Sequence, residues 1–244
     1  MALLDGVKAG VDAIYPARCL TCGDVVDGDY GLCGTCWRDT SFIGGALCDA
    51  CGVPLPGMET DEVLHCDECL AAPKPWQHGR AAVLYTNTGR KLVLSLKHGD
   101  RHEIARPAGL WMAHAARPLI TPNTLIAPVP LHWLRMIKRR FNQSALLAKS
   151  LSLHTGGTCC LDLLQRVRRT RSLNGLDPKA RAQMLENAIR VHPRRRHRLI
   201  GRPILLVDDV LTSGATLSAC TEACLAAGSG PVNVVTLARV SKDA

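Results

Sequence analysis

The sequence predicts an α/β protein, with a parallel sheet covered by helices on both faces and a small cysteine-rich segment before it. Three observations predict this class. From residue 79 onward, apolar stretches of strand length alternate with amphipathic stretches of helix length. The first third of the chain holds closely paired cysteines. Hydrophobic residues make up 47% of the 244 residues and aromatic residues only 4%, so we expect a sizeable core filled by aliphatic side chains.

Residues 1–18 are expected to form an amphipathic N-terminal helix that docks on the rest of the protein. Their apolar side chains are spaced for one helix face: Leu3, Leu4, Val7, Val11 and Ile14. Asp5 and Asp12 interrupt the apolar stretch, which argues against a secretory signal. No apolar run in the sequence approaches the length of a bilayer-spanning helix. We therefore expect a cytoplasmic protein without a membrane span.

Eight of the twelve cysteines form four C-x-x-C pairs. In such a pair a tight turn lets two thiolates face one metal ion, and four thiolates satisfy tetrahedral zinc. The segment 19–72 is therefore predicted to be a double zinc ribbon with two structural zinc ions, because four protein ligands leave no position open for water. The predicted ligands are Cys19, Cys22, Cys33, Cys36, Cys48, Cys51, Cys66 and Cys69.

These cysteines can be paired in two ways. In sequential sites the first four bind one zinc ion and the last four bind the other, whereas in a cross-braced arrangement the pairs interleave. We favour the sequential arrangement, because each set then forms a self-contained ribbon of short loops. Disulfides or an iron–sulfur cluster are the alternatives to zinc, and disulfides fit poorly with a protein that lacks a secretory signal.

The other cysteines, Cys159, Cys160, Cys220 and Cys224, lie outside this segment. Cys220 and Cys224 are one helical turn apart. Free cysteine behaves as a small hydrophobic residue and is among the most buried residue types. We therefore expect these side chains to be buried in the core and to hold no metal ion.

Residues 76–244 are predicted to form the α/β domain, after a linker at 70–76 that prolines keep extended. The helix predicted at 141–154 has Asn142 or Ser144 available as its cap. The first half of the domain is expected to contain strand 79–87, a helix from 88 that ends at Gly99, a helix at 102–119 with Pro107 near its start, strand 123–131 and helix 141–154.

The second half continues the alternation and ends in a strand. Its expected elements are strand 158–169, helix 178–189 with Pro178 in its first turn, strand 203–210, helix 215–228 stopped by Gly228, and strand 232–240. Strands this apolar are expected to be buried on both faces of a parallel sheet. Ligands of such sheets bind beyond the carboxyl ends of the strands.

The stretch "DDVLTSGAT", which follows the strand expected from residue 203, is suited to a phosphorylated sugar. The amides at the start of the next helix, together with its dipole, favour a phosphate monoester. Carboxylates such as Asp208 and Asp209 bind vicinal hydroxyls and magnesium. An ordinary strand–turn–helix with incidental acids is the alternative. The predicted phosphate-binding residues are Thr212, Ser213, Gly214, Ala215 and Thr216.

The stretch "ILLVDDVLTSGAT" resembles the phosphoribosyl-pyrophosphate (PRPP) motif of type I phosphoribosyltransferases. The cysteine ribbon, "LYTNTGRKLVLSLKHGD", "APVPLHWLRMIKRRFNQSALLAKSL" and this motif, in that order, resemble the ComF family of competence-associated proteins. The resemblance covers nearly the whole chain. It implies a type I phosphoribosyltransferase-like domain that binds PRPP with magnesium, and a link to DNA uptake.

The family resemblance also assigns a pyrophosphate-binding loop. The segment "RRFNQ" stands where the family usually reads Arg-Gly-Phe-Asn-Gln, so Arg139 and Arg140 are implied to contact PRPP, and Arg140 replaces a glycine. In the segment that resembles the mobile loop, Leu173 and Met184 replace polar residues. The resemblance therefore supports PRPP binding more strongly than turnover.

If the protein is an enzyme, the resemblance implies displacement of magnesium-bound pyrophosphate from C1 of PRPP by an acceptor that the sequence does not identify. Asp208 and Asp209 would stabilise the positive charge that develops on the ribose, and Arg139 would stabilise the leaving group. Lys91 and Lys97 are candidates to cover the site, and solvated positions on a helix face are the alternative.

The net charge of +9 favours anionic partners. Two other functions are alternatives to PRPP chemistry. In the first, the protein binds single-stranded DNA of the transformation machinery, with PRPP as a regulator. The basic stretch "RVHPRRRHR" at 190–198 and "RVRRTR" at 166–171 would track the phosphates, although no aromatic stacking platform is evident. In the second, the zinc ribbon is a scaffold that recruits partner proteins and PRPP is not bound.

Overall fold

The computed structural model describes residues 15–28, 31–58, 62–98, 101–131, 141–168 and 188–241. Residues 1–14 of the predicted N-terminal helix, and Arg139 and Arg140, lie outside these residues. The helix was wrong at 15–18, where the chain is not helical and Arg18 forms an isolated bridge with Val25. The helix predicted at 178–189 is described only at its last two positions, and Ile189 there begins a strand instead.

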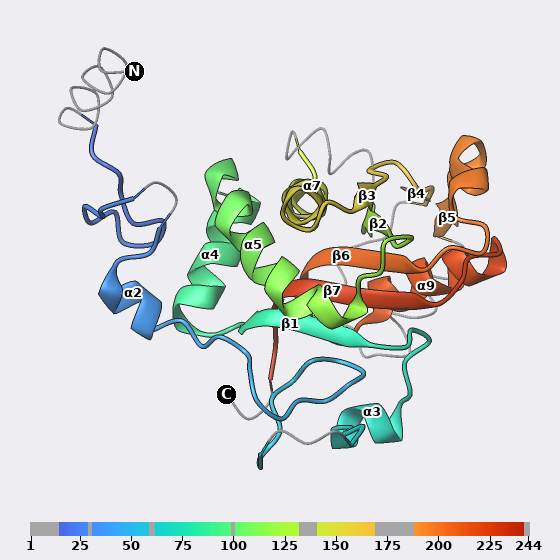
Figure 1. The fold of residues 1–244 in the computed structure, drawn as a ribbon, viewed down its shortest axis with the longest axis horizontal. Helices are drawn as coiled ribbons and strands as arrows, with labels where there is room; N and C mark the ends of the chain where they lie inside the picture. The colour runs from blue at the N-terminus through green and yellow to red at the C-terminus, as the bar shows by residue number, and fades with distance from the viewer. Residues whose placement is uncertain are drawn as a thin grey trace.

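A parallel sheet of five strands forms the centre of the described structure, in the order β1-β7-β6-β2-β3 (Figure 1). Four of the five strands were expected within a few residues of their bounds, because their apolar side chains are buried on both faces. The predicted α/β class is therefore confirmed. The strands are β1 (Gly79–Leu84), β2 (Leu125–Pro128), β3 (Thr158–Cys159), β6 (Ile204–Leu211) and β7 (Val232–Arg239).

Three helices pack on one face of the sheet, and all three were predicted. Asn142 caps the third of them, because its side chain accepts a hydrogen bond from the backbone amide of Ser144. Short 3-10 turns flank the middle helix, and Pro107 lies in its first turn. The elements are α4 (Asn87–His98), η1 (His102–Ile104), α5 (Ala105–Ala116), η2 (Arg117–Leu119) and α7 (Gln143–Thr155).

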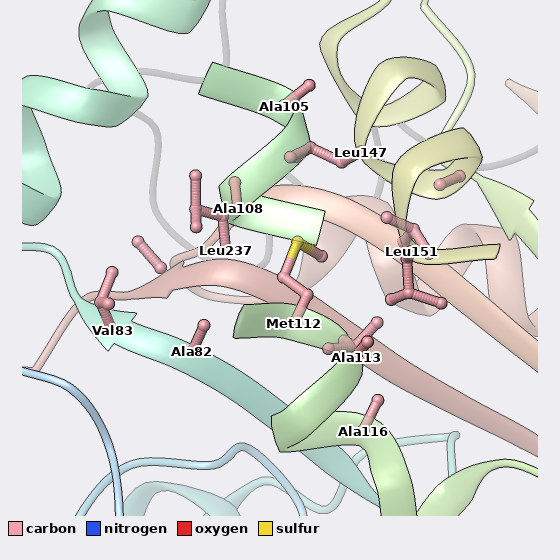
Figure 2. Packing of buried hydrophobic residues seen from close by; sticks show 14 of the residues in the cluster. Ala82, Val83, Ala105, Ala108, Met112, Ala113, Ala116, Leu147, Leu151 and Leu237 are labelled. Atoms are coloured by element: carbon pink, nitrogen blue, oxygen red, sulfur yellow. The ribbon is translucent and has the colours of Figure 1, made fainter. Parts of the chain in front are cut away.

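The core on this face depends on small side chains along α5. Figure 2 shows Ala108 and Ala113 of α5 near β1 and β7, with Leu147 and Leu151 of α7 beside them. Alanine lets a helix axis lie close to the sheet, so the gap is filled with few aromatic side chains. This is how a chain with so few aromatic residues fills its core.

The opposite face is covered by α9 (Ala215–Ala226) and by the second cysteine-rich loop. Cys48, Cys51 and Cys69 are buried in the same apolar cluster as alternate β6 residues, whose neighbours in the strand face the other core. The backbone of Asp49 accepts a hydrogen bond from the amide of Gly79, at 2.8 Å. The second cysteine-rich loop therefore packs directly on the sheet, while the predicted domain boundaries at 18–19 and 72–76 stay predictions.

The strand predicted at 158–169 is wrong in one respect, because the chain forms two short strands there. β3 joins the central sheet, whereas β4 (Leu164–Arg166) pairs with β5 (Ile189–Val191) in an antiparallel two-stranded sheet. A turn at 161–163 separates them, since the amide of Leu163 bonds back to the carbonyl of Cys160. A run of apolar residues cannot show that the pairing partner changes within it.

The chain leaves β2 and β6 toward opposite faces of the sheet. The connection after β2 leads to α7 on one face, and the connection after β6 leads to α9 on the other. These two strands are neighbours in the sheet. A crevice at the carboxyl ends of such strands is the usual ligand site in α/β folds. The predicted phosphate-binding residues begin at this position.

Candidate functional site: a phosphate loop beside two acids

Gly214 joins β6 to α9 in a left-handed conformation, with φ 83° and ψ 2°. A Cβ atom added there would lie 2.7 Å from Cη2 of Trp76. We expected this glycine to let a ligand approach the backbone. The structure gives it two further reasons, a backbone conformation that side chains disfavour and the indole ring packed against it.

The turn before α9 presents donors at one point. The first hydrogen bond of the helix runs from the amide of Ser218 to the carbonyl of Gly214, at 2.8 Å. The amides of Ala215 and Thr216 precede it and have no partner within the helix, and Gly214 supplies no side-chain cap. Thr212 is exposed. The sequence-predicted residues 212–216 thus form one continuous turn that can receive an anion.

Asp208 lies in the carboxyl half of β6 and faces α7. Its Oδ1 atom accepts hydrogen bonds from Oγ of Ser144, at 2.8 Å, and from the amide of Asp209, at 2.9 Å. The sequence suggested Ser144 only as a helix cap. The helix cap is Asn142, which leaves the Ser144 hydroxyl directed at the carboxylate.

Asp209 is 9% exposed and forms an ion pair with Lys97 of α4. Gln143 Nε2 donates to the carbonyl of Lys97 at 3.4 Å, which holds the end of α4 beside the start of α7. The sequence left two positions open for Lys97, one over the site and one solvated on a helix face. The ion pair places Lys97 beside the two acids. Lys91, the other candidate, is an exposed residue of the same helix.

The two carboxylates have different electrostatic environments. Burial, and then the neighbouring charge of Asp209, raise the pKa of Asp208 from 3.8 to about 7, although Ser144 and Lys97 act in the other direction. Near neutral pH, Asp208 is therefore divided between a protonated and an ionised form. A cation or a set of hydroxyl donors placed against it would favour the ionised form.

The chain after β2 returns to the same edge of the sheet. Nδ2 of Asn142 donates to the carbonyl of Val129, at 3.0 Å, and the ring of Phe141 contacts that of His102, with centroids 3.9 Å apart. These contacts fix the end of the segment that was predicted to bind pyrophosphate. Arg139 and Arg140 themselves lie outside the described residues.

The predicted linker at 70–76 packs against the turn of residues 212–216, which is called the phosphate loop below. Trp76 is buried, and its Nε1 atom donates to the carbonyl of Ala50 at 2.6 Å. Nζ of Lys74 lies 3.3 Å from the carbonyl of Ser213. The predicted extended linker is only partly right, because Leu70 and Ala71 end a short helix and the chain bends at 75–77. Composition gave no sign that this segment packs against residues 212–216.

The eight paired cysteines gather as two groups of four, in the sequential order that we favoured. Within each group the sulfur atoms all lie within 4.8 Å of one another. Sγ of Cys22 lies 3.6 Å from that of Cys33, and Sγ of Cys51 lies 3.7 Å from that of Cys66. The groups are Cys19, Cys22, Cys33 and Cys36, called set 1, and Cys48, Cys51, Cys66 and Cys69, called set 2.

These groups fit zinc. Sulfur ligands at about 2.3 Å in a tetrahedron are separated by about 3.8 Å, close to the spacings above. The amide of Cys33 donates to Sγ of Cys19 at 3.3 Å, which is the support that a thiolate needs. Each set supplies four ligands, so a zinc ion bound there would be structural.

The remaining cysteines lie apart from these sets. Cys160, Cys220 and Cys224 are buried, as expected, whereas Cys159 is partly exposed. Burial raises the pKa of the Cys159 thiol to about 11 and that of Cys224 to about 12. Thiols with pKa values this high are poor nucleophiles at neutral pH, which agrees with a packing role.

Comparison with known proteins bears on both parts of the chain. The double zinc ribbon domain family matches residues 10–70. DNA utilization protein YhgH from Shigella flexneri is 32% identical over 231 residues, which cover 92% of this chain and 97% of the relative. Competence protein F from Haemophilus influenzae is 28% identical over 228 residues, covering 91% of this chain and 96% of the relative. The chain belongs to the ComF family.

Phosphoribosyltransferase structures are among the solved structures that resemble this ComF chain. A glutamine PRPP amidotransferase from Bacillus subtilis, complexed with ADP and GMP, is 16% identical, with a TM-score of 0.40. The match covers 59% of this chain and 30% of that one, so this chain spans under a third of its length. A hypoxanthine phosphoribosyltransferase from Staphylococcus aureus is 13% identical, covers 59% and 67% of the two chains, and has a TM-score of 0.33.

The basic stretch at 190–198 of this ComF protein ends β5 and then forms the short helix η3 (Pro193–Arg198). Of the second predicted basic stretch, 166–171, the last three residues lie outside the described residues. Arg195 forms an ion pair with Asp162, with Nη2 and Oδ2 2.9 Å apart. Arg194 and Arg196 are exposed nearby. The predicted basic cluster therefore exists as a surface element, with part of its charge neutralised.

An aromatic cluster that the sequence did not reveal lies elsewhere on the protein. Trp37 of α2 (Gly34–Arg38) is 50% exposed, and its ring contacts those of Phe42 and Trp111, at centroid distances of 4.6 and 6.3 Å. Trp111 is far in sequence from Trp37 and Phe42, so the sequence did not show that the three rings meet. Figure 1 shows α2 and η3, which follows β5, at opposite ends of the molecule, so the aromatic and basic clusters do not form one surface.

Across the part of the chain that the structure describes, no helix combines the length and the apolar character needed to cross a bilayer.

Proposed function

We propose that this ComF protein binds the magnesium complex of PRPP at the turn of residues 212–216 and at the adjacent acids Asp208 and Asp209. The observation that carries the proposal is the position of a turn suited to an anion just after one partly buried and one buried carboxylate, at the strand pair where the connections diverge. The turn matches the 5-phosphate and the carboxylates match the ribose hydroxyls. The motif resemblance and the family membership support the same ligand.

Each side of the proposed site has a defined role. Ala215 and Thr216 donate amides to the phosphate, while Thr212 adds a hydroxyl donor. Ser144 and Lys97 hold the two carboxylates in place from α7 and α4. Arg139 and Arg140 are proposed to contact the pyrophosphate, a role that follows from the family segment alone.

Carboxylates are the ligands that magnesium prefers in proteins, so the donor set fits this ion. Bound magnesium would neutralise charge on the departing pyrophosphate. Asp208 and Asp209 would stabilise the positive charge that develops on the ribose as the C1–oxygen bond lengthens. We propose that the protein transfers the phosphoribosyl group to an acceptor, which the sequence does not identify.

The cysteine sets are proposed to hold two zinc ions that stabilise the fold. We further propose a cytoplasmic role in the handling of imported DNA. Relatives named for DNA utilization and competence support this role, and nearly the full length of both chains is matched.

Calorimetric titration of the full-length, zinc-loaded protein with PRPP and magnesium tests the proposal. Saturable binding that the Asp208→Asn/Asp209→Asn variant loses is the expected result. Asp67→Asn makes the same kind of substitution once, at an exposed position of the short helix α3 (Asp67–Ala71), and should bind like the wild type. Wild-type protein that takes up zinc but does not bind PRPP would leave the DNA-binding or the scaffold function in its place.

Single-stranded DNA binding is the second candidate, and η3 is the observation in its favour. Its arginines lie at the surface on a defined element rather than in an unstructured loop. Phosphate contacts of this kind produce affinity that falls steeply with salt concentration.

A further inference from the structure

Arg239, the last residue of β7, contacts both the phosphate loop and set 2. Its Nη1 atom donates to the carbonyls of Leu211 and Thr212, at 3.3 and 3.2 Å. Its Nη2 atom lies 3.7 Å from Sγ of Cys51 and 3.2 Å from Oε2 of Glu68. One guanidinium group therefore joins the segment that precedes Gly214 to a proposed zinc ligand.

The burial of Arg239 makes this contact energetically important. The residue is 5% exposed. A buried guanidinium is costly unless opposite charge and hydrogen-bond acceptors surround it. Zinc with four thiolates carries a net charge of about −2, so a loaded set 2 places a strong counter-charge at the Nη2 side. Without the metal, neutral thiols would leave Glu68 as the main counter-charge.

Trp76 gives a second, independent connection between the same two places. Its Nε1 atom bonds to the carbonyl of Ala50, between two ligands of set 2. Its ring lies under Gly214. Set 2 thus contacts the loop through a cation on one side and an aromatic ring on the other. The hydrogen bonds at set 1 run from the amide of Cys33 to Sγ of Cys19 and from Oγ1 of Thr40 to the carbonyl of Cys36, within its own segment.

We propose that Arg239 is a positioning residue that makes the phosphate loop depend on the metal held by set 2. With the metal bound, the guanidinium is fixed by Cys51 and Glu68 and in turn fixes the carbonyls of Leu211 and Thr212. Loss of metal from set 2 releases the loop, and loss from set 1 does not. The expected effect on PRPP binding rests on the proposed function. The expected effects on the loop and on metal release do not.

Hydrogen exchange and zinc release test the inference on the full-length, zinc-loaded protein. Arg239→Lys keeps the charge but has a single nitrogen, which cannot contact both sides. We expect exchange of the peptide containing residues 208–216 to increase about tenfold, the effect of losing one charge-assisted hydrogen bond. One of the two zinc ions should be released to a chelating indicator about tenfold faster, as is usual when an outer-sphere partner is lost.

Glu68→Gln and Asp67→Asn form the matched pair of variants. Both are in the first turn of α3, beside Cys66, and both remove one negative charge. Of the two, it is Glu68 that forms the ion pair with Arg239, so only Glu68→Gln should accelerate the release of one zinc ion. If Arg239→Lys fails to fold, the comparison of zinc release from Glu68→Gln and Asp67→Asn tests the inference instead. Equal release from Glu68→Gln and Asp67→Asn, or unchanged exchange in folded Arg239→Lys, would overturn the inference.

A linkage measurement separates this inference from the proposed function. If the loop and set 2 are coupled, magnesium and PRPP should slow the release of the same zinc ion that Arg239→Lys releases faster. Wild-type protein that does not bind PRPP refutes the proposed function, while the exchange and release experiments still decide the inference. PRPP that binds without slowing zinc release, together with unchanged exchange in Arg239→Lys, refutes the inference and leaves the function.

Discussion

Nζ of Lys97 lies 2.9 Å from Oδ1 of Asp209. The two side chains are largely shielded from water, with 22% and 13% of their surfaces exposed. The pair joins two elements at the proposed ribose-binding edge, because α4 supplies the lysine and β6 the carboxylate. Its electrostatics lead to the first prediction.

Replacing Lys97 by methionine should destabilise the protein by about 1–3 kcal/mol. The change leaves Asp209 beside Asp208 without a counter-charge, and partial exposure keeps the cost below that of a fully buried pair. Urea denaturation at pH 8 measures the free energy of unfolding. Lys91→Met, on the exposed side of the same helix, should change it by less than about 0.5 kcal/mol. Equal effects of the two variants would contradict a structural ion pair.

Stability should fall with rising pH because of Asp208. Its pKa in the folded protein is about 7, against 3.8 in a solvated chain, so the folded state holds the proton more tightly. The contribution of the protonated carboxyl is complete below pH 3.8 and is lost as pH rises toward 7. Asp208→Asn cannot ionise, so its melting temperature should gain on that of the wild type between pH 5 and pH 8. A constant difference across this range would count against the raised pKa.

Binding of magnesium and PRPP should show the opposite pH dependence. The ionised form of Asp208 is the better ligand for magnesium and the better acceptor for ribose hydroxyls. The affinity should therefore increase with pH up to the neighbourhood of 7 and then level off. Titrations at several pH values measure this. An affinity that is highest at pH 5 would mean that Asp208 does not bind in its ionised form.

Gly214→Ala should cost more than the same change at another left-handed glycine. Gly228 has φ 94° and nothing within 4 Å of an added Cβ atom, so Gly228→Ala should cost about 1–2 kcal/mol for the backbone alone. At Gly214 the Cβ atom also meets Trp76 at 2.7 Å, which adds about 1–3 kcal/mol of overpacking. Denaturant midpoints compare the two variants. Similar midpoints would show that the Trp76 ring moves aside without a measurable loss of stability.

Removing zinc should destabilise the α/β sheet as well as the ribbon. Cys48, Cys51 and Cys69 belong to the apolar cluster that covers one face of the sheet, so metal loss disturbs that core directly. A chelator should lower the melting temperature by more than about 10 °C in a single transition. Two separate transitions, with the sheet transition unmoved, would indicate independent domains.

Single-stranded DNA binding predicts a reduced salt dependence when Arg194, Arg195 and Arg196 are replaced by alanine. Three lost phosphate contacts would lower the slope of log affinity against log salt by about 2. Arg195 already pairs with Asp162, so Asp162→Asn should free it and strengthen binding. An unchanged slope in the triple variant would remove η3 from DNA binding.

Local sequence patterns were sufficient to predict most helices and strands and the hydrogen-bond donors within each. The C-x-x-C spacing, the apolar runs of β6 and β7, the cap at Asn142 and the stop at Gly228 act over a few residues, so they are visible in the sequence. The same holds for the turn at 212–216, whose residues are contiguous. The strand at 158–169 was only half right, because β3 and β4 pair with partners distant in sequence.

The sequence by itself determined the four cysteine pairs, the α/β class and the turn proposed to bind phosphate, because spacing and apolar periodicity encode them locally. The grouping of the cysteine pairs into two sets came from the structure. Only the tertiary structure decided what contacts them. Ser144 meets Asp208 across 64 residues, and Arg239 meets Cys51 across 188. Such contacts depend on the strand order and on the face to which each connection crosses, which no local pattern specifies. For this reason Lys97, Trp76 and Arg239 acquire their roles in the fold, where buried polar groups must find partners.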